Sequence, residues 1–305
     1  MNLPSLRAVA LTLTFGVAAL SAGCNRNAIT AIELANEADK LVKVDVDGAI
    51  SKYEQATKLD PSNHVLFRKL GSAYEKKEAW DKVASVMATA SRLDPKNADY
   101  LFRRGKALRM LAEKGPTGWD EAREPLEKCV QVDPNYSDCY FQLGEVYLQT
   151  DDEQKAVEAW NKAIAHEPSE LIFYGPLLEL YVSLNYNDLA IQLANEGLKV
   201  GDAKKPGYVS LLQHLANAYQ GKGDLANAAA SLEKAKDADV EGQHPELAFA
   251  LGSTYAVMSP PKKDKALQLL KSFNTRTCKG PKAVKYKAQC DQSQSLMQSL
   301  GGPAQ

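Results

Sequence analysis

The stretch Tyr140-Phe141-Gln142-Leu143-Gly144-Glu145-Val146-Tyr147 decides how this chain folds. Its first tyrosine, leucine, glycine and last tyrosine have the spacing i, i+3, i+4, i+7, which places them on one face of an α-helix. Phe67-x-x-Leu70-Gly71-x-x-Tyr74 repeats the pattern earlier in the chain. Apolar residues at helical spacing and a proline then follow each stretch: Val83, Ala90 and Pro95 in the earlier case, and Ala156, Trp160, Ala163 and Pro168 in the later one. A glycine at the centre of such a helix allows a second helix to cross it closely.

Acidic residues followed by proline mark a period along the chain. These prolines are Pro61, Pro95, Pro134 and Pro168, which gives steps of 34, 39 and 34 residues. A turn lengthened by residues 114–118 accounts for the longer step. Period and residue types together resemble the tetratricopeptide repeat, whose period is 34 residues. The resemblance implies an all-α fold, a right-handed α-solenoid of helix-turn-helix repeats with a C-terminal capping helix.

Weaker copies of the pattern extend the array over 31–275. The resemblance predicts seven units, at about 31–61, 64–97, 98–134, 137–168, 171–202, 209–240 and 245–277. Residues 278–305 are expected to form a capping helix and tail, with one polar helix over 283–300. A cap of this kind covers the apolar flank that the last repeat would otherwise expose.

The first residues read as a targeting segment. An uncharged run over 8–20 follows Arg7, and it is shorter than the roughly 20 residues needed to span a bilayer. Leu20-Ser21-Ala22-Gly23-Cys24 resembles the bacterial lipobox. The resemblance implies a signal peptide over 1–23, lipidation of Cys24, and an anchor with a short linker over 24–30. Asn25 in place of aspartate implies the outer membrane, on the periplasmic side. The alternative is an ordinary signal peptide that ends by chance before a cysteine.

Four further cysteines remain, and an even number suits an oxidising compartment. Cys129 and Cys139 are expected on helices that pack together, so a disulfide between them is favoured. Cys278 and Cys290 bracket a Lys-Gly-Pro turn, and a second disulfide would join the cap to the last repeat. Buried free thiols are the alternative. Zinc is disfavoured because no Cys-x-x-Cys or close Cys/His pair occurs.

Nothing in the sequence indicates catalysis. The four histidines, His64, His166, His214 and His244, are scattered over different predicted units. There is no H-E-x-x-H, phosphate-binding loop, nucleophile elbow or dinucleotide-binding turn. We therefore expect no enzyme, no cofactor and no metal. With 37 basic and 38 acidic residues, the chain also lacks the basic excess of nucleic-acid-binding proteins.

In the family that the repeats resemble, the first helix of each repeat lines a concave groove. The resemblance places seven residues of interest there: Arg68, Phe102, Lys106, Arg109, Phe141, Glu145 and Phe249. The three cations and the phenylalanines suggest a site for an extended or helical peptide with acidic character. The alternative is that the phenylalanines pack on adjacent helices. Residues 260–291 hold nine basic and two acidic residues, which suits either an anionic partner or a solvated cap.

These features favour a protein-interaction scaffold of the cell envelope that binds a protein or peptide partner. The layout is similar to that of pilotins and outer-membrane assembly lipoproteins. That resemblance implies an assembly role for a pilus, secretion or outer-membrane complex. The alternative is an accessory subunit that presents polysaccharide or cell-wall enzymes.

Overall fold

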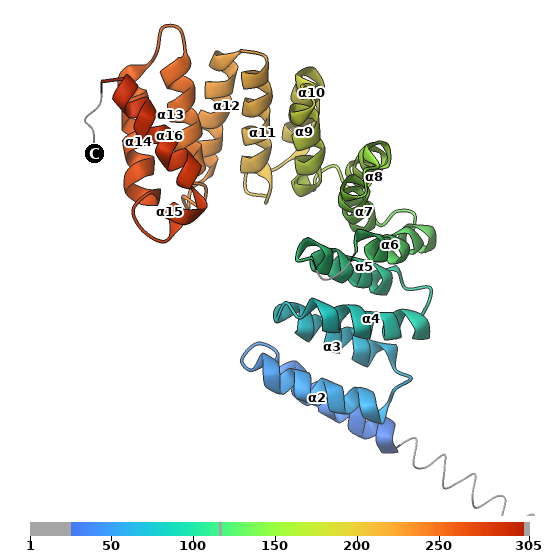
Figure 1. Cartoon of the computed structure of the whole chain (residues 1–305). Coiled ribbons are helices and arrows are strands. Elements are labelled where there is room, and N and C mark those ends of the chain that lie inside the picture. The colour runs from blue at the N-terminus through green and yellow to red at the C-terminus, as the bar shows by residue number, and fades with distance from the viewer. Residues whose placement is uncertain (1–25, 116–117, 302–305) are drawn as a thin grey trace, which may run out of the picture. The chain divides into compact units, whose positions relative to one another are not determined.

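The computed structural model describes residues 26–115 and 118–301, and every regular element in these ranges is a helix (Figure 1). Helices that follow one another in sequence pack against each other. The all-α fold of consecutive helix pairs expected from the sequence is therefore confirmed. The chain divides into two compact units, one up to Ala156 and one from Val157 onward.

The first unit starts, in its described part, with a helix over 26–41. Six helices follow it: α2 (Val46–Leu59), α3 (His64–Lys76), α4 (Trp80–Leu93), α5 (Ala98–Glu113), α6 (Trp119–Val132) and α7 (Ser137–Gln149). From α2 to α7 each helix contacts the next. The boundary between the units falls inside α8 (Glu153–His166).

The second unit contains the remaining helices. They are η1 (Leu171–Phe173), α9 (Tyr174–Ser183), α10 (Asn187–Val200), α11 (Tyr208–Gly221), α12 (Leu225–Ala238), α13 (Glu246–Val257), α14 (Lys263–Thr277), α15 (Lys282–Lys285) and α16 (Lys287–Ser299). Consecutive helices from α9 to α14 contact one another, and α16 packs on both α13 and α14.

Two expectations about the ends of the array were wrong. Residues 26–30, which the sequence analysis assigned to the linker, belong to the first helix. The cap is two helices rather than one, because the chain breaks at Tyr286. Tyr286 adopts φ −107° and ψ 23°. Its side chain is buried, packing edge-on against Phe273 and donating a hydrogen bond to Glu246.

The turn inside a helix pair recurs with the same backbone geometry. Residues Glu78, Asp151, Asn185 and Gly223 all have φ between 53° and 74°. The N–H of the residue after each of them bonds to the carbonyl of a tyrosine five residues earlier, and the tyrosines are Tyr74, Tyr147, Tyr181 and Tyr219. This 6→1 bond with a left-handed residue is the Schellman ending of a helix. The repeat therefore controls where its first helix stops, through backbone conformation.

Helix crossing within a pair depends on a glycine. A Cβ added to Gly105 of α5 would lie 2.4 Å from Cγ of Leu126 in α6. At Gly71 of α3 the added Cβ would meet the terminal methyl of Met87 at 2.3 Å. Leu126 is fully buried, and its branch carbon is fixed by the surrounding core. Met87 is also buried, but its unbranched side chain adapts more easily.

A tyrosine hydroxyl links successive repeats at three places. Tyr74 donates to Glu54, Tyr147 donates to Glu127 at 2.9 Å, and Tyr255 donates to Glu233. Burial, followed by the hydrogen bond and the negative charge of the glutamate, raises the pKa of Tyr147 to about 12. The same causes raise the pKa of Tyr255 to about 12. The folded chain therefore holds these phenol protons more tightly than the unfolded chain does.

We predict that Gly105→Ala lowers the free energy of unfolding by about 1–3 kcal/mol, because overpacking at Leu126 forces side chains or backbone to shift. Gly71→Ala should stay within about 1 kcal/mol of the original protein, since Met87 can move and alanine favours the helix. Urea unfolding followed by circular dichroism measures both. Equal losses at the two positions would contradict this account of the crossing.

We also predict that stability falls as the pH rises from about 10 to about 12. Tyrosines with a folded-state pKa near 12 stabilise the fold fully below the ordinary tyrosine pKa of about 10, and this contribution disappears above it. The double variant Tyr147→Phe with Tyr255→Phe should lose less stability over this interval than the original chain. Tyr186→Phe is the control, because Tyr186 is 56% exposed. Urea unfolding at several pH values tests whether the double variant has the shallower dependence.

Candidate functional site

The first helices of successive repeats in the first unit, α3, α5 and α7, carry six of the seven residues predicted to face a partner. α3 contributes Arg68 alone, whereas α5 and α7 each contribute two side chains four residues apart, such as Phe102 and Lys106 on α5, so each such pair shares one helical face. All six are partly exposed. Phe249 lies on α13 in the second unit.

The Phe102 ring packs against neighbouring residues of the repeat array, which is the alternative to a partner-binding role that the sequence analysis left open. Its ring centroid lies 5.4 Å from that of Tyr136, with the planes tilted by 33°. It contacts a buried cluster that includes Leu101 and Cys129. Nζ of Lys106 lies 6.0 Å from the Phe102 ring centroid, within range of a cation–π contact. Phe102 is therefore partly exposed and is fixed in position by this packing.

Arg109 has an internal role. Its Nε donates to Oε1 of Gln142 at 2.5 Å, which links α5 to α7. Its guanidinium also pairs with Glu113, and only 14% of the side chain is exposed. Arg109 is thus a connection between repeats, and its charge is already neutralised.

Arg68 and Lys106 differ from Arg109. Within the part of the chain that the structure describes, neither side chain forms an ion pair or a hydrogen bond. Arg68 lies close enough to Asp39 to help lower the pKa of that carboxyl. Burial of Asp39 opposes the lowering, and hydrogen bonds from Lys69 and Tyr53 outweigh it. Arg68 and Lys106 are therefore the two cations of this face that could bind an acidic group.

Phe141 and Glu145 complete the face on α7. Both are partly exposed, and both already interact with other groups of the chain. They add shape and charge to the face, and no role for them depends on an unpaired group.

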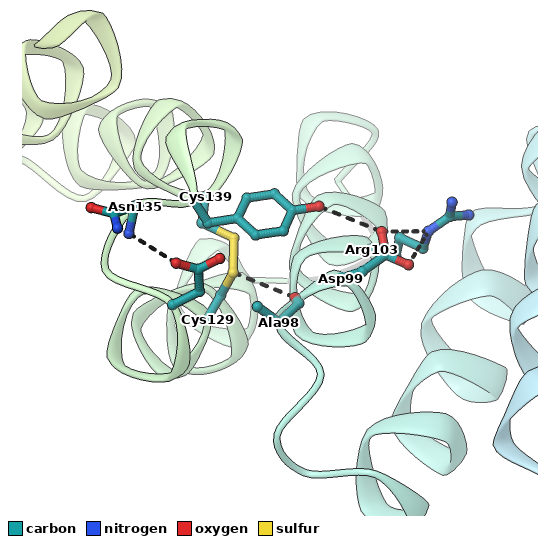
Figure 2. The surroundings of a disulfide bond; sticks show 8 residues. Ala98, Asp99, Arg103, Cys129, Asn135 and Cys139 are labelled. Carbon is teal, nitrogen blue, oxygen red and sulfur yellow. Dashed lines mark hydrogen bonds and ion pairs between the residues drawn. A yellow bond between two sulfur atoms is a disulfide. The ribbon is translucent and has the colours of Figure 1, made fainter. Parts of the chain in front are cut away.

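A residue that sequence reasoning missed organises the same region. Arg103 of α5 binds Asp99 one turn earlier and reaches Ser72 at 2.9 Å and Glu75 at 3.1 Å on α3. Figure 2 shows Asp99 and Arg103 side by side next to the disulfide. The hydroxyl of Tyr136 lies 3.4 Å from Asp99. Burial, then the charges of Asp99 and Asp138, raise the pKa of Tyr136 to about 12. The i, i+4 spacing of Asp99 and Arg103 was the one signal in the sequence.

Two disulfides are present. Cys129 of α6 is bonded to Cys139 of α7, with their Cα atoms 6.3 Å apart (Figure 2). Sγ of Cys129 lies 3.5 Å from the carbonyl oxygen of Ala98, at the start of α5. In the second unit Cys278 is bonded to Cys290, with Cα atoms 5.7 Å apart. The first bond thus lies behind the Phe102 ring, and the second joins α14 to α16.

The histidines are distributed among local contacts. His64 Nδ1 lies 2.7 Å from the Tyr100 hydroxyl, and His244 Nδ1 lies 3.0 Å from Glu246. Burial lowers the pKa of His214. No group of three or more potential metal ligands occurs among the described residues.

The predicted lipidation site, Cys24, lies outside the described residues. In the helices that the structure describes, none combines the length and the apolar character needed to cross a bilayer.

Comparison with known proteins supports the repeat assignment. Residues 126–158 and 209–239 each match a family model described as tetratricopeptide repeat. A solved tetratricopeptide repeat protein from Parabacteroides merdae is 18% identical to this chain, and the two structures superpose with a TM-score of 0.60. The match covers 87% of this chain and 98% of the other protein. That likeness shows the fold. The chain is built as an interaction scaffold of helical repeats. It contains tetratricopeptide repeats.

Two curated proteins share part of the array. Anaphase-promoting complex subunit 3 of Schizosaccharomyces pombe is 27% identical over 119 residues, which is 38% of this chain and 17% of that protein. Hsp70-Hsp90 organizing protein 1 of Glycine max is 27% identical over 145 residues, which is 48% of this chain and 23% of that protein. The chain therefore spans less than a quarter of the length of either relative.

Proposed function

We propose that this chain is a lipid-anchored scaffold of the bacterial envelope that holds a protein partner on the α3–α5 face. The observation that carries the proposal is the pair Arg68 and Lys106, two cations that form no ion pair among the described residues, with Lys106 beside the partly exposed Phe102. Unpaired cations next to a rigid aromatic ring suit a partner segment that combines acidic and apolar groups. Arg103 and the Cys129–Cys139 disulfide hold this face in shape.

The names of the curated relatives are consistent with a role in holding other proteins. One is a subunit of a multiprotein complex, and the other is named for organising two proteins. We extend only that general role to this chain. An assembly function in a pilus, secretion or outer-membrane complex is our first proposal. Presentation of polysaccharide or cell-wall enzymes is the second. In either case we propose that the chain itself is not an enzyme.

The anchoring proposal rests on the lipobox-like residues 20–24. Arg26 already lies in a helix that packs into the first unit, so a lipid on Cys24 would hold the first repeat close to the bilayer. Partner binding would then take place near the membrane surface, on the periplasmic side of the outer membrane.

We predict that Cys24→Ala releases the protein from the membrane in soluble form, because it removes the thiol that carries the lipid. Fractionation of cells followed by immunoblotting measures the distribution. Cys129→Ser with Cys139→Ser is the control, and it should remain in the membrane fraction. Unchanged membrane association of Cys24→Ala would refute the lipid anchor.

We predict that Arg68→Glu with Lys106→Glu lowers partner recovery at least about tenfold, because two attractive charges become repulsive. In-vivo crosslinking and affinity purification measure the recovery. The matched control is Lys58→Glu with Lys82→Glu, two exposed lysines on the second helices of their repeats.

The recovered proteins also separate the two proposals. Subunits of a secretion, pilus or barrel-assembly complex support the first, and glycan enzymes support the second. Full recovery with the Arg68 and Lys106 variant would remove this face as the binding site, and recovery of no protein would overturn the scaffold role.

A further inference from the structure

A cleft of about 490 Å³ lies in the second unit, where the capping helices meet the last repeats. Four helices line it, and three of them carry polar or aromatic pairs: α11 provides Gln213 and Asn217, α13 provides Phe249 and Ser253, and α16 provides Gln289 and Gln292. On α11 and α13 these residues are four apart, so each helix turns one face to the cleft. The volume falls in the range of about 300–1,000 Å³ that is common for ligand sites.

The lining of this cleft includes four unused side-chain amides. In the described part of the chain, no side-chain hydrogen bond involves Gln213, Asn217, Gln289 or Gln292. Gln220, by contrast, is engaged, since its amide donates to Thr254 at 2.8 Å. The hydroxyl oxygen of Ser253 is buried without a hydrogen-bond partner. Each free amide can donate and accept at the same time.

Two charged residues line the cleft, Glu246 and Lys285, and both contact Tyr286. Glu246 accepts a hydrogen bond from Tyr286 at 3.0 Å and lies 3.0 Å from Nδ1 of His244. Nζ of Lys285 lies over the Tyr286 ring at 5.1 Å from its centroid. Phe249 packs on Phe273 with ring centroids 5.4 Å apart, and its partly exposed side gives the cleft an apolar surface. An uncharged ligand with an apolar group fits this lining better than an ion does.

One wall of the cleft is not part of any repeat. α16 packs on α13 and α14, and its Cys290 is bonded to Cys278 at the end of α14 (Figure 1). Cys290 lies between Gln289 and Gln292 in sequence, so the disulfide is attached at the segment that carries both amides. The position of this wall is therefore coupled to the covalent bond.

The surface on which α16 packs is partly polar. Asn274 and Thr277 of α14 and Ser293 of α16 are buried, and Nδ2 of Asn274 and the two hydroxyl oxygens have no hydrogen-bond partner among the described residues. Such groups oppose burial. Apolar packing by Met297 and by the Phe273–Tyr286 contact offsets part of this unfavourable burial. The disulfide is thus a main constraint on where α16 lies.

We propose that this cleft binds an uncharged, extended polypeptide segment bearing an aromatic side chain, and that the Cys278–Cys290 disulfide holds the α16 wall of the site in place. A peptide backbone presents N–H and C=O groups in alternation, and side-chain amides match both. The aromatic side chain would pack on Phe249. That the ligand is a polypeptide rests on the proposed scaffold role; the location and chemistry of the site rest on the cleft itself.

The test uses the full-length folded chain and a defined probe, the pentapeptide Ser-Thr-Phe-Thr-Ser, acetylated and amidated so that it carries no charge. Two comparison peptides replace the phenylalanine by glutamate or by lysine, and maltopentaose represents a neutral glycan. Titrations followed by ¹H–¹⁵N spectra of the side-chain amides report both affinity and location. We expect the phenylalanine peptide to shift the amide signals of Gln213, Asn217, Gln289 and Gln292, and the charged peptides to bind at least about tenfold more weakly.

Variants distinguish an effect on the α16 wall of the cleft from a general loss of folded structure. Gln289→Ala with Gln292→Ala should weaken binding about tenfold, whereas Gln294→Ala, an exposed glutamine of the same helix outside the cleft, should not. Cys278→Ser with Cys290→Ser should weaken binding at least as much with the helical content unchanged. Cys129→Ser with Cys139→Ser is the matched control, because that disulfide lies in the first unit.

The outcomes are distinct. Absence of binding by the phenylalanine peptide, preference for a charged peptide, or binding of maltopentaose in its place would overturn the proposed ligand. Full affinity in the Cys278 and Cys290 variant would overturn the role of the disulfide. The Arg68→Glu, Lys106→Glu variant should bind the peptide normally, so a failure here is distinguishable from a failure of the proposed function.

Discussion

The close crossing of two helices at a glycine is the constraint on which each repeat depends. At Gly105 no side chain fits between α5 and the buried Leu126 of α6. A close crossing also requires that the first helix ends at a fixed residue. In four turns, a left-handed residue and a 6→1 hydrogen bond to a tyrosine carbonyl fix that end. The same tyrosine position bonds through its hydroxyl to a glutamate of the preceding repeat at Tyr74, Tyr147 and Tyr255.

The glycine, turn and tyrosine positions of each repeat are used for packing, so the residues available to bind a partner are the exposed ones of the first helices. Polar side chains there have two kinds of role. Arg103 and Arg109 join neighbouring repeats, and their charges are paired. Arg68 and Lys106 form no ion pair among the described residues, and Lys106 lies beside Phe102, which packs on Tyr136. A stable array with a small number of free groups can hold a partner at little cost in conformational freedom.

The two disulfides have different surroundings. Cys129–Cys139 lies within a buried apolar cluster behind Phe102, where packing already holds α6 and α7 together. Cys278–Cys290 fastens a helix that is not part of a repeat and that rests on a partly polar surface. The second bond therefore has more influence on geometry than the first. The Cys278–Cys290 bond lies next to a cleft lined by free side-chain amides. The Cys129–Cys139 bond supports a face whose unpaired groups are charged.

The sequence by itself determined the helix pairs, because period, glycine and apolar spacing are local properties that survive in any repeat context. It also indicated which cysteines lie on neighbouring helices. It did not determine which cations are free: Glu113 four residues after Arg109 is a local signal of an ion pair, but the bond from Arg109 to Gln142 of the next repeat is visible only in the structure. The break at Tyr286 and the amide-lined cleft were equally hidden. Both depend on contacts between residues far apart in sequence, such as Tyr286 with Glu246, and the packing of α16 on α13 and α14 brings these together.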